Sequence, residues 1–151
     1  MQVAIDTSVL IALIDPLDIW RTRAIALIDA LLVDDVVPIY FDCVTAEAVS
    51  TAARRLHEKG RGNEVRDLLD RLEMRIPYEL IIWILPDVPR FYSEALAMIR
   101  SSSGELNFND ALIALACRER NIPAIASFDP DFDQLPWLEQ MATPQDVGAG
   151  G

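Results

Sequence analysis

Residues 3–16 of the chain read VAIDTSVLIALIDP. The first three of them form a short apolar run of the β type, which ends at Asp6. Thr7 and Ser8 can both cap a helix that the following apolar residues continue, and the Asp15-Pro16 pair stops it. This stretch therefore predicts a strand followed at once by a helix, with an acidic residue at the junction.

The rest of the chain repeats this alternation of short apolar runs with longer segments of helical period. Strands are expected at residues 36–41, 80–85 and 124–127, and helices at 18–34, 42–60, 63–76, 89–101 and 110–120. At 80–85, periodicity alone does not distinguish a strand from a helix. The alternation is typical of βα units, so we expect an α/β fold, a three-layer α/β/α sandwich with a central, mainly parallel sheet.

The length of 151 residues fits one domain. We assign residues 1–145 to a single domain and expect residues 146–151 to be a disordered tail. The longest apolar stretches, Val9 to Ile14 and Leu80 to Leu85, are far shorter than the ~20 residues of a membrane span. The N-terminus shows no basic lead-in and no cleavage site, so the expected location is the cytoplasm.

The chain is strongly acidic, with 13 Lys and Arg residues, 24 Asp and Glu residues and a formal net charge of −11. A negative net charge repels nucleic acid, so any such substrate must be bound by a local group of basic or polar residues rather than by the overall charge. A basic group lies at Arg54, Arg55, Lys59, Arg61 and Arg66. It can supply phosphate contacts or form a solvated helix face, and the sequence leaves both interpretations open.

Few residues indicate thiol, zinc or histidine chemistry. Cys43 and Cys117 are far apart and have no partner pattern, so we expect core residues rather than a disulfide or a zinc site. His57, the only histidine, lies in a charged stretch and is expected to be a solvated helix residue. Chemistry that needs two histidines is therefore excluded.

Four acidic residues lie just beyond the expected strands or at the start of an expected helix: Asp6, Glu47, Asp110 and Asp129. In an open parallel α/β sheet, ligands bind beyond the C-terminal ends of the strands, so we expect these side chains to converge there. Taken singly, each is also explained by the preference for acids near helix N-termini. Converging carboxylates raise one another's pKa unless cations bind between them. The set therefore predicts a metal site.

Mg²⁺ or Mn²⁺ suits such a site, because hard divalent cations prefer oxygen ligands and keep several waters, which leaves room for substrate phosphate oxygens. One ion can lower the pKa of a bound water, while the same ion or a second one stabilises the leaving oxygen. The predicted chemistry is metal-assisted cleavage of a phosphodiester bond. It requires no histidine, cysteine or lysine.

In order and spacing these segments resemble a PIN domain. The resemblance rests on VAIDTSVL at 3–10, Glu47, LNFNDALIA at 106–114 and SFDPDF at 127–132, and it covers Val3 to about Leu138. It is closest to the prokaryotic VapC-type toxins, small single-domain proteins of type II toxin-antitoxin systems. The resemblance implies metal-dependent endonucleolytic cleavage of RNA, including transfer and ribosomal RNA.

The resemblance also implies roles for individual acids. Asp6, Glu47 and Asp110 match the first three acids of the family, and Asp129 best matches the fourth. Asp131 crowds the same loop and can coordinate the metal instead, or both residues can simply cap a turn.

The resemblance also implies roles for two serines and a set of partners. Ser8 and Ser127 match positions where the family has a hydroxyl near the metal, and plain capping is equally compatible with both. The partners implied are an RNA substrate, a small antitoxin protein that covers the acidic groove and a second copy of the chain in a homodimer, with no membrane.

Other readings of the acids fit less well. A haloacid-dehalogenase-like phosphatase needs a second acid two residues after the first, where this chain has Ser8. A receiver domain needs a lysine after a late strand, whereas the only lysine, Lys59, lies in a mid-chain helix. The alternatives that stay open are a non-catalytic PIN-like binding or scaffold module and a DNA-directed nuclease of the same fold.

Overall fold

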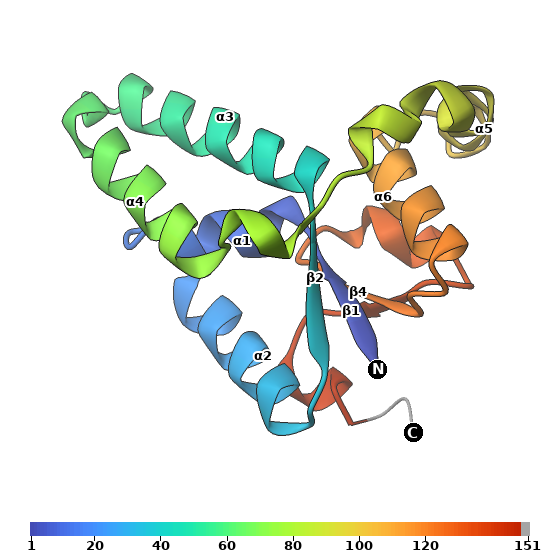
Figure 1. Ribbon diagram of the computed structural model, residues 1–151, viewed down its shortest axis with the longest axis horizontal. Helices are drawn as coiled ribbons and strands as arrows, with labels where there is room; N and C mark the ends of the chain where they lie inside the picture. The colour runs from blue at the N-terminus through green and yellow to red at the C-terminus, as the bar shows by residue number, and fades with distance from the viewer. Residues whose placement is uncertain (149–151) are drawn as a thin grey trace.

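The computed structural model describes residues 1–148, which form a five-stranded sheet with helices on both sides (Figure 1). The sheet is ordered β3-β2-β1-β4-β5, and every neighbouring pair of strands is parallel. The expected α/β fold with a mainly parallel sheet is confirmed. The strands are β1 (Gln2–Ile5), β2 (Val37–Phe41), β3 (Ile81–Ile82), β4 (Ala124–Ala126) and β5 (Glu139–Met141).

The helices form the two outer layers. In Figure 1, α1, α2 and α4 lie on one side of the sheet, and α6, covered by α5, lies on the other. Helix α3 begins directly after β2 and contacts α1, α4 and α6. The helices are α1 (Thr7–Ile14), α2 (Arg21–Val33), α3 (Asp42–Glu58), α4 (Val65–Arg75), α5 (Val88–Ser101) and α6 (Phe108–Glu119). Short 3₁₀ turns occupy Gly62–Glu64, Tyr78–Leu80, Leu85–Asp87, Pro130–Gln134 and Pro144–Asp146.

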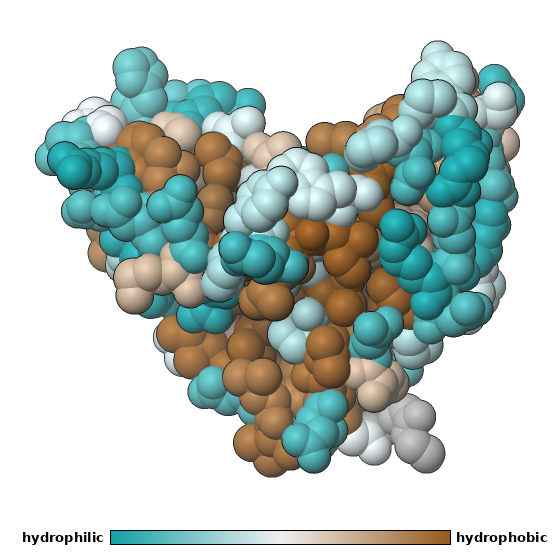
Figure 2. All heavy atoms as spheres, viewed as in Figure 1, coloured by the Kyte–Doolittle hydropathy of each residue, from teal (hydrophilic) through white to brown (hydrophobic). Residues whose placement is uncertain are grey.

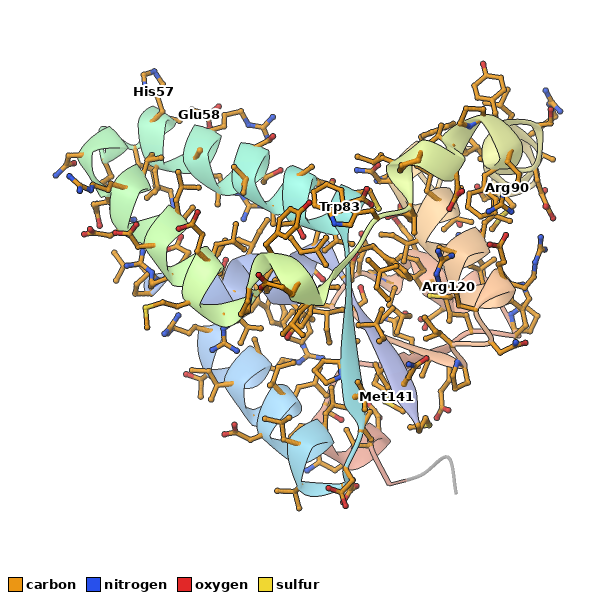
Figure 3. The ribbon with its side chains drawn as sticks, viewed as in Figure 1. His57, Glu58, Trp83, Arg90, Arg120 and Met141 are labelled. Atoms are coloured by element: carbon orange, nitrogen blue, oxygen red, sulfur yellow. The ribbon has the colours of Figure 1, made fainter. Side chains whose placement is uncertain are left out.

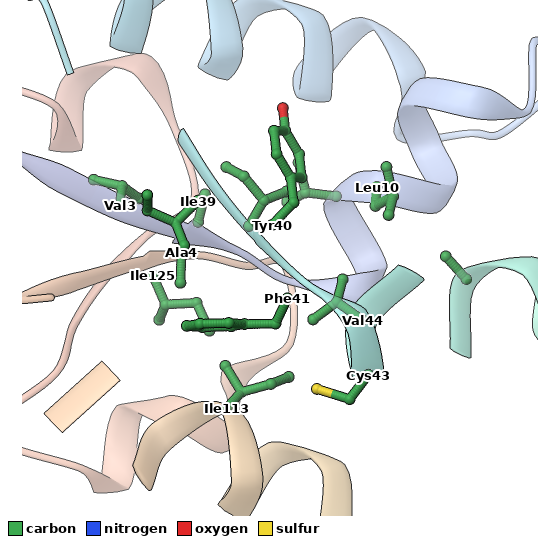
Figure 4. Close-up of a cluster of buried hydrophobic side chains, with 14 of the residues drawn as sticks. Val3, Ala4, Leu10, Ile39, Tyr40, Phe41, Cys43, Val44, Ile113 and Ile125 are labelled. Atoms are coloured by element: carbon green, nitrogen blue, oxygen red, sulfur yellow. The ribbon is translucent and has the colours of Figure 1, made fainter. Parts of the chain in front are cut away.

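The central strands are buried on both faces, which is why they appear in the sequence as continuous apolar runs rather than alternating ones. Residues 3–5 of β1 and all of β4 are completely buried. Figure 4 shows the ring of Phe41, at the end of β2, between Ile125 of β4 and Ile113 of α6. Every residue of α6 from 111 to 117 is buried, as expected for a helix that is apolar nearly all round.

The register of the central strands determines which side chains meet at the C-terminal edge of the sheet. Ile5 of β1 pairs with Ala126 of β4, and the backbone N–H of Asp6 donates to the Ala126 carbonyl at 3.0 Å. Asp6 and Ser127 therefore follow two adjacent strand ends. Helix α3, which starts where the neighbouring β2 ends, carries Glu47.

The prediction of one buried strand over residues 80–85 is wrong. Only Ile81–Ile82 are in a strand, and 3₁₀ turns flank them. The buried carboxylate of Asp42 explains the break, because it accepts hydrogen bonds of 3.0 Å from the backbone N–H groups of both Ile84 and Leu85. These bonds replace ladder pairing with β2, and much of the apolar run is left facing outward.

Two residues of the predicted disordered tail, 146–151, belong to the folded domain. Asp146 accepts hydrogen bonds from the backbone N–H groups of Ala142 (2.8 Å) and Thr143 (2.7 Å), and Val147 is buried. The 3₁₀ turn that contains Asp146 lies against α2. The last three residues of the predicted tail, 149–151, lie outside the described residues.

The remaining sequence-based expectations concern single residues. Cys43 and Cys117 are both buried and unbonded, and burial raises the pKa of each thiol to about 12, which suits a core role. His57 is exposed near the outer end of α3 (Figure 3).

Within residues 1–148, no helix combines the length and apolar character needed to cross a membrane.

The predicted basic group is largely engaged in ion pairs at the surface. Three of its four arginines pair with nearby acids, Arg54 with Glu58, Arg55 with Asp18 and Arg61 with Glu64. The side chains of the first pair are about two-thirds exposed. The structure thus favours a solvated helix face for most of this group, and Arg55 is the member that also lines a pocket.

Candidate active site

Asp6 is almost fully buried at the C-terminal edge of the sheet, with 4% of its surface exposed. Its Oδ2 accepts hydrogen bonds from Ser127 Oγ (2.7 Å) and Ser8 Oγ (2.8 Å). Burial raises the pKa of Asp6, and the two hydroxyl donors oppose that rise. The same hydroxyls accept the backbone N–H groups of Phe128 and Asp129, each at 3.0 Å. The two serines therefore join the loop after β4 to the Asp6 carboxylate.

Glu47 reaches the same region from the early turns of α3. Its Oε2 accepts hydrogen bonds from Thr7 Oγ1 (3.1 Å) and Asn109 Nδ2 (2.9 Å). Thr7 begins α1, and Asn109 lies in the first turn of α6. The carboxylate is thus held at the N-termini of two helices, where the helix dipoles favour negative charge.

Asp110 closes a capping box at the start of α6. Its side chain accepts the backbone N–H of Asn107 at 3.0 Å, while the Asn107 side chain accepts the N–H of Asp110 at 2.9 Å. Burial raises the pKa of Asp110 to about 7, and the charges of Asp6, Asp129 and Glu47 contribute to the rise. These four carboxylates therefore lie close enough to influence one another.

The loop after β4 supplies further acids. Asp129 Oδ1 accepts the backbone N–H of Asp131 at 3.0 Å and so caps the 3₁₀ turn at Pro130–Gln134. The pKa of Asp131 is raised by partial desolvation, by the charge and hydrogen bond of Asp129, and by the charges of Glu105 and Asp6. Asp131 thus also lies near the other acids. Asp129 both caps the turn and lies close enough to Asp110 to influence its pKa.

These five acids, Asp6, Glu47, Asp110, Asp129 and Asp131, form what we call the acidic group. Among the residues that the structure describes, none of the five forms a salt bridge. Figure 2 shows the surface hollowed between the side formed by α3 and α4 and the side formed by α5, at the end toward which β2 points. Carboxylates that lack salt-bridge partners favour a ligand that brings positive charge.

The donor set fits a hard divalent cation, because every side chain offered is a carboxylate or a hydroxyl. Within residues 1–148, no three or more Asp, Glu, His or Cys side chains are already arranged as a metal-binding group. Mg²⁺ typically uses one or two carboxylates and retains several waters, so it does not require a closed cage of protein ligands. Asp6, Glu47, Asp110 and Asp129 are the residues that could hold such an ion.

Several functional neighbours were not identified from the sequence. Asn107 caps α6, which begins at Phe108, two residues before the helix start predicted at Asp110. The Asn-x-x-Asp spacing of Asn107 and Asp110 is a sequence signal for this cap. Asn109 and Thr7 bind Glu47, and Glu105 contributes charge near Asp131. No local sequence pattern marks these last three, because each contact joins segments far apart in the chain.

Comparison with known proteins agrees with this architecture. A search of curated proteins gave no match. The crystal structure of VapC20 from Mycobacterium tuberculosis, described as a sarcin-ricin loop cleaving toxin, is similar in fold, with a TM-score of 0.64 and 20% sequence identity over 91% of this chain and 97% of that one. The family model of the PIN domain matches residues 3–138. The chain therefore belongs to the PIN domain family.

Proposed function

We propose that this protein is a metal-dependent endoribonuclease that cleaves phosphodiester bonds at the acidic group. The observation that carries the proposal is the convergence of Asp6, Glu47, Asp110 and Asp129 from separate parts of the chain. Burial raises the pKa of Asp110 to about 7, and the charges of the other three acids add to that rise. Within residues 1–148 none of these acids forms a salt bridge, and such clustering of carboxylates is unfavourable without a cationic ligand.

The proposed role of each residue follows from its contacts. Asp6, Glu47, Asp110 and Asp129 would hold Mg²⁺ or Mn²⁺, with Asp131 as a further or alternative ligand. The bound ion would activate the attacking water and stabilise the leaving oxygen. Ser8 and Ser127 orient the Asp6 carboxylate through their hydrogen bonds of 2.8 and 2.7 Å.

RNA is the proposed substrate, because VapC20, which shares the fold, is a toxin that cleaves the sarcin-ricin loop. The same analogy supports a toxin of a toxin-antitoxin pair acting in the cytoplasm, where its RNA substrate would be. A small antitoxin protein is the proposed inhibitor. The acidic group, which forms no salt bridge within residues 1–148, would suit a cationic segment of that protein.

A homodimer is proposed through an apolar surface beside the edge strand β3. This β3 surface consists of Tyr78, Leu80, Trp83 and Leu85, which are 69%, 57%, 48% and 44% exposed. Figure 3 shows Trp83 near the start of α3. A groove of about 400 Å³, lined in part by Val49, Ile81 and Trp83, adjoins it. Contiguous exposed apolar residues at a sheet edge are typical of a protein-protein contact.

The decisive experiment compares the unmodified protein with Asp110→Asn. Both are incubated with a panel of structured RNAs and with matched single-stranded DNA, in Mg²⁺, Mn²⁺ or EDTA. Metal-dependent cuts in RNA that the substitution abolishes would support the proposal, and cuts confined to DNA would reassign the substrate. If the folded, metal-loaded protein leaves every nucleic acid intact, the endoribonuclease proposal is wrong and a non-catalytic binding module takes its place.

A further inference from the structure

A second hollow lies beside the acidic group and has a different chemistry. It has a volume of about 330 Å³, which is in the range of small ligand sites. Its lining residues are Ser8, Trp20, Arg55, Phe128, Asp129 and Pro130. Ser8 and Asp129 are shared with the candidate active site, so a ligand in this hollow would lie against the acids.

Two aromatic rings form one wall of the hollow. Trp20 and Phe128 stack with their ring centroids 5.4 Å apart and their planes 24° from parallel. Trp20 is 42% exposed, so part of its ring is accessible to a ligand. Its backbone N–H donates to Asp18 Oδ1 at 2.8 Å, which holds the turn before α2 in place. The pair is therefore a partly exposed, preformed stacking surface.

Arg23 supports this pair from outside the hollow. Its guanidinium carbon lies 5.0 Å from the Trp20 ring centroid and 4.7 Å from that of Phe128. Arg23 Nε donates to the carbonyl of Ala142 at 2.8 Å, so the guanidinium is anchored to the protein and does not line the hollow. Because one cation already occupies this pair, a neutral planar ring is favoured over a second cation as the ligand.

Arg55 adds a positive charge to the lining of the hollow. Its guanidinium lies 4.0 Å from Asp18, and its side chain is 51% exposed. A single long contact leaves most of the five guanidinium N–H donors free for another acceptor. Arg55 can therefore contact a phosphate while the aromatic pair contacts a base.

The hollow is also coupled to the candidate active site through the backbone. The N–H of Phe128 donates to Ser8 Oγ at 3.0 Å, and Ser8 Oγ donates to Asp6 at 2.8 Å. The stacking ring is thus positioned by the same hydroxyl that orients a proposed metal ligand.

We propose that the Trp20–Phe128 hollow binds one unpaired base of an RNA substrate, next to the phosphodiester bond that the acidic group cleaves. The proposal rests on the ribonuclease function proposed above and adds the recognition element that the net charge of −11 requires. Proteins hold single-stranded RNA largely by stacking bases on aromatic rings and contacting phosphates with arginine. Both components are present here.

The test measures binding of a short, unstructured, fluorescein-labelled RNA by fluorescence anisotropy, with Asp110→Asn as the common background so that the RNA stays intact. Trp20→Ala is expected to weaken binding by about 10- to 100-fold, and Trp20→Phe to retain most of it. Trp137→Ala is the matched control, because Trp137 is 39% exposed and has Arg118 at 5.9 Å but lies in a different pocket. It is expected to bind as the background does.

A second arm replaces each nucleotide of the RNA in turn by an abasic site. One position is expected to weaken binding in the background protein and to have no effect in Trp20→Ala, because the base and the ring then report the same contact. Equal affinity of Trp20→Ala and Trp137→Ala, or no RNA binding at all, would overturn the proposal. Cleavage by the protein with Asp110 intact, measured in parallel with Mg²⁺, tests the ribonuclease function separately.

Discussion

The amide of Asn109 donates a hydrogen bond of 2.9 Å to the carboxylate of Glu47, which lies 62 residues earlier in the chain. Thr7 donates to the same oxygen at 3.1 Å, so one carboxylate oxygen is held by α1 and α6 together. The other oxygen is left for a ligand. Asn109 is therefore a positioning residue for Glu47.

Asn109→Ala should lower RNA cleavage by about 10- to 100-fold, because residues that orient metal-binding side chains have effects of this size. The loss should be partly recovered at high Mg²⁺ if it arises from weaker metal binding. Cleavage rates over a Mg²⁺ series measure both effects. Asn63→Ala, at an exposed position before α4, is the control and should behave as the unmodified protein. Equal activity of the two variants would mean that Glu47 needs no such support.

The two serines that bind Asp6 should differ in importance. Ser127 is fully buried and also accepts the N–H of Asp129, so Ser127→Ala leaves buried groups unpaired. We expect a loss of about 1–3 kcal/mol in the free energy of unfolding, together with weaker Mn²⁺ binding by calorimetry. Ser8→Ala should have a smaller effect, because Ser8 is only partly buried and water can replace it. Ser93→Ala, at an exposed position of α5, serves as control, and a larger effect of Ser8→Ala than of Ser127→Ala would contradict this order.

The positions of Asp6 and Ser127 could be predicted because they depend on two regular features. Each follows a short apolar run, and parallel strands bring their C-terminal ends to one edge. Once the runs at 3–5 and 124–127 are taken as strands, their proximity follows from the topology. The same reasoning predicted the acids of the candidate site without any knowledge of side-chain contacts.

The failures have a common physical cause in long-range contacts. The run at 80–85 is as apolar as a strand, but its backbone N–H groups at Ile84 and Leu85 donate hydrogen bonds to the distant Asp42, and the run turns away after Ile82. Strand β5 has the opposite character, because only Met141 of its three residues is buried and no apolar run announces it. The local sequence pattern therefore indicates neither the turn after Ile82 nor the strand β5.

Asp110 should make the metal-free protein less stable as the pH rises. Its folded-state pKa is about 7 against an ordinary value of 3.8, so between these values the folded chain holds a proton that the unfolded chain releases. Stability contributed by that proton is therefore lost progressively from about pH 4 to pH 7. In EDTA at pH 8, Asp110→Asn should be more stable than the unmodified protein by about 1–2 kcal/mol, or roughly 3–8 °C in Tm.

Thermal unfolding at pH 5 and pH 8 measures this difference, which should shrink at the lower pH. Adding Mg²⁺ at pH 8 should raise the Tm of the unmodified protein and leave that of Asp110→Asn nearly unchanged, because a ligand stabilises only the state that binds it. If Asp110→Asn is less stable at pH 8, the capping box at Asn107 outweighs the electrostatic repulsion.

Trp83→Arg should shift the protein toward the monomer, because it places a charge at the centre of the proposed dimer surface. Light scattering over a concentration series reports the mass. Leu32→Arg is the matched control, since Leu32 is similarly exposed (57%, against 48% for Trp83) but lies on α2, away from the β3 surface. A monomer mass for the unmodified protein, or identical masses for both variants, would exclude this surface as the dimer contact.

The loop after β4 offers three acids at alternate positions, Asp129, Asp131 and Asp133, and they should differ in effect. Asp129 raises the pKa of Asp110, so its charge acts directly on the site. Asp131 faces Asp129 and Asp6 from the edge of the group, whereas Asp133 is exposed. Asp129→Asn keeps an oxygen that can accept the Asp131 N–H, so the turn should survive while metal-dependent cleavage falls by at least about 100-fold.

Asp131→Asn should weaken Mn²⁺ binding by about tenfold, because it removes a charge but not the proposed principal ligand. Asp133→Asn should leave both quantities unchanged and so controls for loss of net charge. Parallel measurement of cleavage rate and Mn²⁺ affinity separates the three. If Asp131→Asn abolishes cleavage and Asp129→Asn does not, then Asp131 is the fourth ligand and Asp129 serves only to cap the turn that presents it.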